Sequence, residues 1–169
     1  PLTNILEQIQ DIDKKSGKTY LRETLEYANT DLICYRVETP QELRKLQEKS
    51  WDPILEIYFE KYGIELVKTH GLNHVLQDKY SMKKFCTILE GYSSQKKFIV
   101  CKITHLLGSA LISVLLEKRI IDKNNAWRLS RIEEDWQQKT WGTDSDSMLA
   151  EKNKRRDFNL YVACLESVD

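Results

Sequence analysis

The chain has 169 residues, of which 41% are hydrophobic and 31% are charged, and this composition is typical of a folded globular domain. Its 26 basic residues balance 26 acidic ones. The net charge therefore gives no electrostatic reason to expect nucleic acid or an anionic membrane as the main partner. The most apolar run, residues 103–116, is too short and too polar for a membrane span, and no secretory signal is visible. Because the chain starts at Pro1 rather than Met, we expect further residues before it.

Four cysteines lie far apart in the sequence, at Cys34, Cys86, Cys101 and Cys164. They form no C-x-x-C pair, and none has a histidine nearby at the spacing of zinc ligands. Three of them lie in apolar strings, LICY, KKFCTIL and YVACL. A free cysteine in such a string usually acts as a small hydrophobic residue. We therefore expect free thiols and a reducing compartment.

Helices are predicted for most of the first half. Apolar residues at helical spacing indicate a helix over residues 2–12 that is ended by Gly17, followed by a second short helix around Tyr20. Residues 30–40 are rich in β-branched and aromatic side chains and favour an extended segment.

Prolines and a glycine mark the next elements. Pro40 suits the first turn of a helix that runs towards Trp51, and Pro53 either kinks this helix or starts the next one, which ends at Gly63. Residues 64–72 form a short strand-like stretch that closes in a turn.

The second half is predicted to be a bundle around a long central helix over residues 95–118, which should be the most buried. Gly108 in its middle indicates close approach of a neighbouring helix, because glycine inside a helix costs roughly 1 kcal/mol. A short helix with Ser81 as its N-cap comes before it, and two helices over residues 122–141 and 144–165 follow.

These elements predict an all-α, single-domain chain over residues 1–169, a multi-helix bundle with a long central helix and one short strand-like segment. We expect about 60% helix or more in roughly seven or eight helices. Asp122 should cap the helix over residues 122–141, and Gly142 should end it.

The search for catalytic and metal-binding motifs finds none of the usual ones. The chain has no phosphate-binding glycine-rich loop, no nucleophile elbow and no zinc-protease motif. His70 and His74 are four residues apart, but Gly71 lies between them in a turn, which argues against a metal site. His105 lies among apolar helix residues and is expected to be a hydrogen-bonded core histidine. We therefore predict no catalytic residue, no metal and no cofactor.

The basic cluster at residues 152–156 (KNKRR) is flanked by Glu151 and Asp157, which is typical of a solvated helix face. A helical nucleic-acid binder or a scaffold protein stays open as an alternative. A nucleic-acid binder would require a continuous basic face at this cluster.

Residues 126–142 carry three tryptophans with three acidic residues between them. Helical spacing turns Ile132 and Trp136 towards the core, while Glu133 and Gln137 share another face. The acidic side chains are then either ordinary exposed charges or a surface that contacts a partner protein. We expect Glu133 to point towards solvent or the edge of a groove.

The string SRIEEDWQQKTWG at residues 130–142 resembles the hallmark of the assembly chaperones for the α subunit of the F-type ATP synthase soluble head. Further motifs match this family in order and spacing along essentially the whole chain. They are Pro1-Leu2-Thr3-Asn4, Thr30-Asp31-Leu32, Cys34-Tyr35-Arg36, Gln47, Trp51-Asp52-Pro53, Tyr62-Gly63, Leu107-Gly108-Ser109, Ala126-Trp127 and Trp141-Gly142.

The resemblance implies a helical C-terminal domain that usually follows a small β-rich N-terminal domain, which is absent from this chain. It implies a chaperone, not an enzyme, that binds the free α subunit and shields it until it pairs with β. Glu133 matches the acidic position on which the family's activity depends, and Glu134, Gln137 and Trp141 are further candidate contacts beside it. The expected chain is a monomer in the mitochondrial matrix or the cytoplasm of an α-proteobacterium, without cofactor, nucleic acid or membrane insertion.

An enzyme that uses Glu133 and Glu134 for acid–base chemistry is the remaining alternative, and it would need a shared deep pocket.

Overall fold

The computed structural model describes residues 2–168 and confirms the mainly helical fold, with helices making up 75% of the described part. Nine α-helices and two short strands are present there, and none of these helices is long and apolar enough to cross a membrane. The elements in chain order are α1 (Leu2–Gln10), α2 (Lys14–Asn29), a 3₁₀ turn (Leu32–Cys34), β1 (Tyr35–Arg36), α3 (Gln41–Tyr62), β2 (Thr69–His70), α4 (Lys79–Glu90), α5 (Ser94–Leu107), α6 (Ala110–Glu117), α7 (Lys123–Ser130), α8 (Ile132–Trp141) and α9 (Ser145–Ser167).

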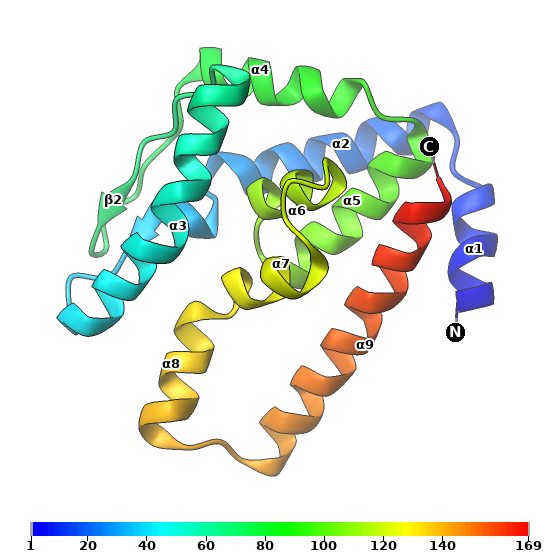
Figure 1. The fold of residues 1–169 in the computed structure, drawn as a ribbon. Coiled ribbons are helices and arrows are strands. Elements are labelled where there is room, and N and C mark those ends of the chain that lie inside the picture. Colours follow the sequence, from blue (N-terminus) through cyan, green and yellow to red (C-terminus); the bar gives the residue numbers. More distant parts are fainter. Residues whose placement is uncertain (1, 169) are drawn as a thin grey trace.

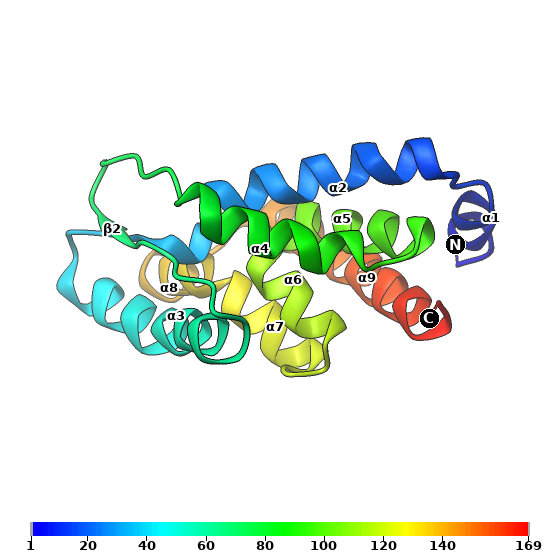
Figure 2. The ribbon, with the colours of Figure 1, turned by 90° about the horizontal axis from the view of Figure 1, so that it is seen from above.

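Helices α2 and α5 pack side by side in the middle of the molecule, with α6 against both (Figure 1). Helix α3 lies on one side of this centre, α4 runs along α2, and α1 packs against α9 on the other side, so that the molecule is elongated (Figure 2). The large buried side chains come from several of these helices, among them Trp51, Tyr58, Phe85 and Phe158. A single core therefore runs through the length of the bundle.

The break between the first two helices is not at Gly17, so that prediction was wrong. Helix α2 begins earlier because the Asp13 carboxylate accepts a hydrogen bond from the Ser16 amide at 2.7 Å, which caps its N-terminus. Gly17 lies buried inside α2, and a Cβ atom at this position would come within 2.8 Å of the Ser94 hydroxyl. The glycine therefore permits close packing of α2 against the start of α5.

Pro53 lies inside one continuous helix, α3, which ends at Gly63 as predicted. The glycine adopts φ +63° there, a left-handed conformation that an L side chain disfavours. Ser81 is not an N-cap, because the Asp78 carboxylate caps α4 instead and accepts from the Ser81 amide at 3.0 Å. The buried Ser81 hydroxyl accepts a hydrogen bond from the Glu65 amide. The extended segments are confirmed as two-residue strands, with β1 pairing in parallel with β2.

The predicted long helix over residues 95–118 is two helices, α5 and α6, although it is confirmed as the most buried region, since α6 is almost fully buried. Gly108 adopts φ +74° at the break, and no atom lies within 4 Å of the position of a Cβ there. Its role is therefore conformational, and the expected close approach of a neighbouring helix is not found. Ser109 then caps α6 by accepting from the Ile112 amide.

The helix predicted over residues 122–141 is also divided, into α7 and α8, with the break at Arg131. Asp122 caps α7 and Gly142 follows the last residue of α8, which confirms both predicted ends. These two divisions explain why nine helices are described where about seven or eight were expected.

Candidate functional site

Helix α8 and the first turns of α9 form an arm that projects from the bundle (Figure 1). Ile132 is buried and attaches the start of α8 to the core, and α8 packs against α3. Every residue from 139 to 150 is exposed, and the side chain of Trp141 is 81% exposed. The arm therefore presents a large aromatic side chain to solvent, which single-chain folding does not explain.

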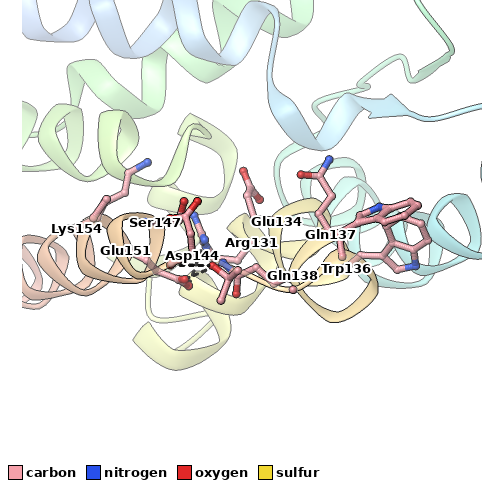
Figure 3. Close-up of a pocket in the computed structure, with 13 residues that line it drawn as sticks. Arg131, Glu134, Trp136, Gln137, Gln138, Asp144, Ser147, Glu151 and Lys154 are labelled. Atoms are coloured by element: carbon pink, nitrogen blue, oxygen red, sulfur yellow. Dashed lines mark hydrogen bonds and ion pairs between the residues drawn. The ribbon is translucent and has the colours of Figure 1, made fainter.

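An open groove of about 970 Å³ separates α8 from α9, and three of the four candidate residues line it: Glu134, Gln137 and Trp141. Figure 3 shows Glu134 and Gln137 projecting to the same side of α8. The two helices are tied together across the groove through Glu151, which accepts from Gln138 at 3.0 Å and forms an ion pair with Arg131 at 3.2 Å.

Glu133 lies apart from the other three candidates. It is half-buried and lines a second, small cavity of about 90 Å³ together with residues of β1, α3 and the turn after β2. Glu133 and Gln137 are four residues apart on α8, yet they line different cavities, since Glu133 lies beside β1 and α3 whereas Gln137 lines the groove. The Glu133 carboxylate forms no ion pair within residues 2–168.

Arg36 forms a wall of the same small cavity and is almost completely buried. Its guanidinium donates to the Tyr35 carbonyl at 3.1 Å and to the Asp52 carboxylate at 2.6 Å, and it lies 5.3 Å from the ring centre of Trp51. The Arg36 Nε atom is buried without a hydrogen-bond partner among the described residues. A charged side chain with an unused donor thus lies beside the cavity that Glu133 lines.

The surroundings of Arg36 are held rigidly. Burial alone would raise the pKa of Asp52, but hydrogen bonds from Arg36 and Lys68 outweigh it and keep this pKa below its usual value. The Trp51 indole donates to the Leu129 carbonyl at 2.8 Å, which joins α3 to the last turn of α7. Since α8 follows α7 after a single residue, this contact also sets the position of Glu133.

His70 and His74, which the sequence spacing raised as a possible metal pair, do not converge on one site. His70 pairs with Glu48 at 3.7 Å, whereas the His74 ring lies 3.4 Å from the Tyr35 hydroxyl. His105 is exposed and not a core histidine, so that expectation was wrong.

The basic cluster at residues 152–156 is divided among different contacts. Arg155 donates to Asn124 at 3.0 Å and lies over the Trp127 ring, while Arg156 pairs with Asp157 at 3.6 Å. Two of the four basic residues of the cluster are therefore engaged in contacts within the chain. Glu133 and Glu134 line different cavities, so the shared pocket required for paired-carboxylate chemistry is not formed between them.

Two site residues, Arg36 and Asp52, were not singled out from the sequence, although both lie in motifs of the family resemblance. One signal was available: Arg36 ends an apolar, extended string, and a charged residue in such a string is rarely buried unless it is paired. The identity of its partner could not be read from the sequence, because Asp52 lies on a different element.

Comparison with known proteins identifies similar chains. Residues 1–58 match the family model described as ATP12 chaperone protein. The mitochondrial protein atp12 of Schizosaccharomyces pombe is 23% identical over 181 residues, which cover 99% of this chain and 62% of the yeast protein. This chain therefore spans less than two thirds of that relative's length.

Solved structures show the same fold. The Atu1473 protein of Agrobacterium tumefaciens superposes with a TM-score of 0.90 at 24% identity, covering 96% of this chain and 61% of that one. Atp12 of Paracoccus denitrificans gives a TM-score of 0.90 at 22% identity, covering 97% of this chain and 70% of that one. The resemblance to the ATP12 chaperone protein family seen in the sequence is therefore confirmed.

Proposed function

We propose that this chain is a chaperone for assembly of the F-type ATP synthase soluble head, and that its client is the free α subunit. The similarity to ATP12 proteins along almost the whole chain is the observation that carries the proposal. The place of action would be the mitochondrial matrix or the cytoplasm of an α-proteobacterium.

The arm formed by α8 and α9 is the part of the surface best suited to hold a client. A subunit that awaits its partners exposes interface-sized apolar surface, and such surface self-associates. Trp141 is an exposed aromatic side chain of the kind that anchors protein interfaces. Met148 and Leu149 add exposed apolar surface on α9, and charged residues, including Glu134 and Lys154, line the groove. An apolar patch with a charged rim binds a partner and still allows its release.

The proposed function predicts that the chain, at equimolar ratio, suppresses light scattering by purified ATP synthase α subunit during refolding. Trp141→Ala should weaken binding by about 2 kcal/mol or more, a loss of roughly 30-fold, because a buried interface tryptophan is a typical hot spot. Isothermal titration calorimetry with the α subunit measures this loss.

Tyr80→Ala is the matched control for Trp141→Ala. Tyr80 is also an exposed aromatic residue, 66% exposed, but it lies on α4, far from the arm (Figure 1). Binding should be unchanged in this variant. If the unmodified chain leaves α-subunit aggregation unaltered, the proposed client is wrong. If Tyr80→Ala and Trp141→Ala lose binding equally, the client is held elsewhere.

A further inference from the structure

Three side chains with metal-binding donor atoms meet on the face formed by α2 and α5, away from the arm. Cys101 and His105 are four residues apart on α5, and Glu23 lies opposite them on α2. The Cys101 Sγ atom is 3.2 Å from the Glu23 carboxylate and 3.6 Å from the His105 Nε2 atom, which in turn lies 3.5 Å from that carboxylate.

These three separations match those of ligands around one zinc ion. Zinc binds thiolate sulfur at about 2.3 Å and imidazole nitrogen or carboxylate oxygen at about 2.0–2.2 Å, in tetrahedral geometry. The donor atoms of two such ligands are then separated by about 3.3–3.6 Å. Two edges of the donor triangle on α2 and α5 have this length and the third, at 3.2 Å, is about 0.1 Å shorter, so no rearrangement of the helices is needed.

The exposure of the three groups also suits an ion that enters from solvent. Cys101 is fully buried and lies at the base, while the side chains of Glu23 and His105 are 42% and 37% exposed. A water molecule could therefore complete the tetrahedron on the solvent side. The ring of Tyr27 lies beside the His105 ring, with 5.3 Å between the ring centres.

We propose that Glu23, Cys101 and His105 form a binding site for one Zn²⁺ ion, with water as the fourth ligand. The combination of thiolate, imidazole and carboxylate favours zinc over magnesium or calcium, which take oxygen ligands. Binding converts the Cys101 thiol to a thiolate and releases its proton to solvent. The ion then links α2 to α5, the two helices at the centre of the bundle.

The same contacts have an alternative explanation without a metal. The Cys101 thiol then donates a hydrogen bond to Glu23, and His105 forms an ordinary pair with the same carboxylate. Burial raises the pKa of the Cys101 thiol to about 12, and the hydrogen bond to Glu23 adds to this rise, so the metal-free thiol is neutral. The two states are distinguished by whether a metal forms a bond to sulfur.

The test is titration of the purified, reduced chain with Co²⁺, which replaces Zn²⁺ in tetrahedral sites and absorbs visible light. We expect one equivalent to produce a sulfur-to-cobalt charge-transfer band in the near ultraviolet, and we expect Zn²⁺ to displace it. Cys101→Ala should abolish this band. His105→Ala should lower the affinity for Co²⁺ by at least about 100-fold, since even loss of a group that only supports a ligand costs 10–100-fold.

Two control variants are matched to the site. His70 and Glu48 form a similar exposed histidine–carboxylate pair at 3.7 Å, but no cysteine lies beside them among the described residues. The Cys86 Sγ atom lies 3.5 Å from the Glu90 carboxylate, but no histidine joins these two groups among the described residues. The variants His70→Ala and Cys86→Ala should therefore bind Co²⁺ as the unmodified chain does.

Cys101 is buried, so Cys101→Ala can fail to fold. Thermal unfolding of the Glu23 and His105 variants tests the site without it. Because Glu23 and His105 are partly exposed, Glu23→Gln and His105→Ala should keep the metal-free melting temperature. Zn²⁺ should raise the melting temperature of the unmodified chain and not that of His105→Ala. The site does not exist if excess Co²⁺ gives no charge-transfer band, or if the band persists in Cys101→Ala.

Discussion

Asp31→Ala should lower the free energy of unfolding by about 3–5 kcal/mol. The Asp31 side chain is fully buried and accepts four hydrogen bonds. Two come from the amides of Ala110 and Leu111, at 2.9 and 3.1 Å, and one from the Ser109 hydroxyl at 2.5 Å. Alanine would leave these buried donors without an acceptor at the start of α6, where the helix dipole favours negative charge.

Denaturant unfolding followed by circular dichroism measures this loss, and Asp13→Ala is the matched control. Asp13 caps α2 in the same way but at an exposed position, so its loss should cost only about 1 kcal/mol. Equal effects of the two substitutions would contradict the role assigned to Asp31.

The stability of the protein should also depend on pH through Asp31. Burial raises the pKa of this carboxyl from 3.8 to about 7, although its hydrogen bonds oppose the rise. Because the folded state binds the proton more tightly than the unfolded state, this contribution is present below about pH 4 and is lost as the pH rises through 7. Relative to Asp31→Asn, which cannot titrate, the unmodified chain should therefore lose stability between pH 4 and pH 7.

Glu133→Gln should weaken binding of the α subunit by about 2–5 kcal/mol, if the carboxylate pairs with a cationic group of the client in a desolvated interface. This prediction rests on the proposed function. Glutamine keeps the shape of the side chain and removes only its charge, so the small cavity beside Arg36 is preserved. The melting temperature should stay nearly unchanged.

The lysine variant is a less selective test than the sequence suggested. From its helical position alone, Glu133→Lys should change stability by less than roughly 0.5 kcal/mol. The structure places Glu133 half-buried in a cavity that Arg36 also lines, so a lysine would bring a second cation towards a buried one. We therefore expect Glu133→Lys to lose binding and also to melt several degrees earlier.

Glu90→Gln is the control for Glu133→Gln, because Glu90 is also an acidic residue but lies exposed on α4, away from the arm (Figure 1). Calorimetric titration of both variants with the α subunit separates the two carboxylates. Normal binding by Glu133→Gln would make Glu133 a bystander. A large fall in its melting temperature would make Glu133 structural.

Most helices could be predicted from local sequence because their ends depend on nearby residues. Gly63 and Gly142 end helices through backbone conformations that glycine adopts easily, and Asp122 caps α7 through an amide three residues away. The errors at Gly17 and Ser81 were of another kind. Each of these residues has a partner distant in sequence, Ser94 for the glycine and Glu65 for the serine.

The sequence predicted which segment carries the candidate site, but not how the residues of that segment are arranged. The tryptophans and acidic residues of residues 126–142 do lie on the exposed arm and its base, and the family resemblance pointed there as well. The division of that segment between two cavities was not predictable. It depends on α3 and β1, which bring Arg36 to one side of α8, and on α9, which closes the groove on the other.

Residue order by itself established the all-α class, the approximate position of most helices and the resemblance to the family, because periodicity, capping and motif spacing act over a few residues. The break between α5 and α6 and the buried environment of Arg36 required the folded chain. Asp31 must reach Ala110, which lies 79 positions later, before the amides at the start of α6 are satisfied. A helical pattern gives the direction in which a side chain points, but the neighbour that it meets there depends on how the other helices pack.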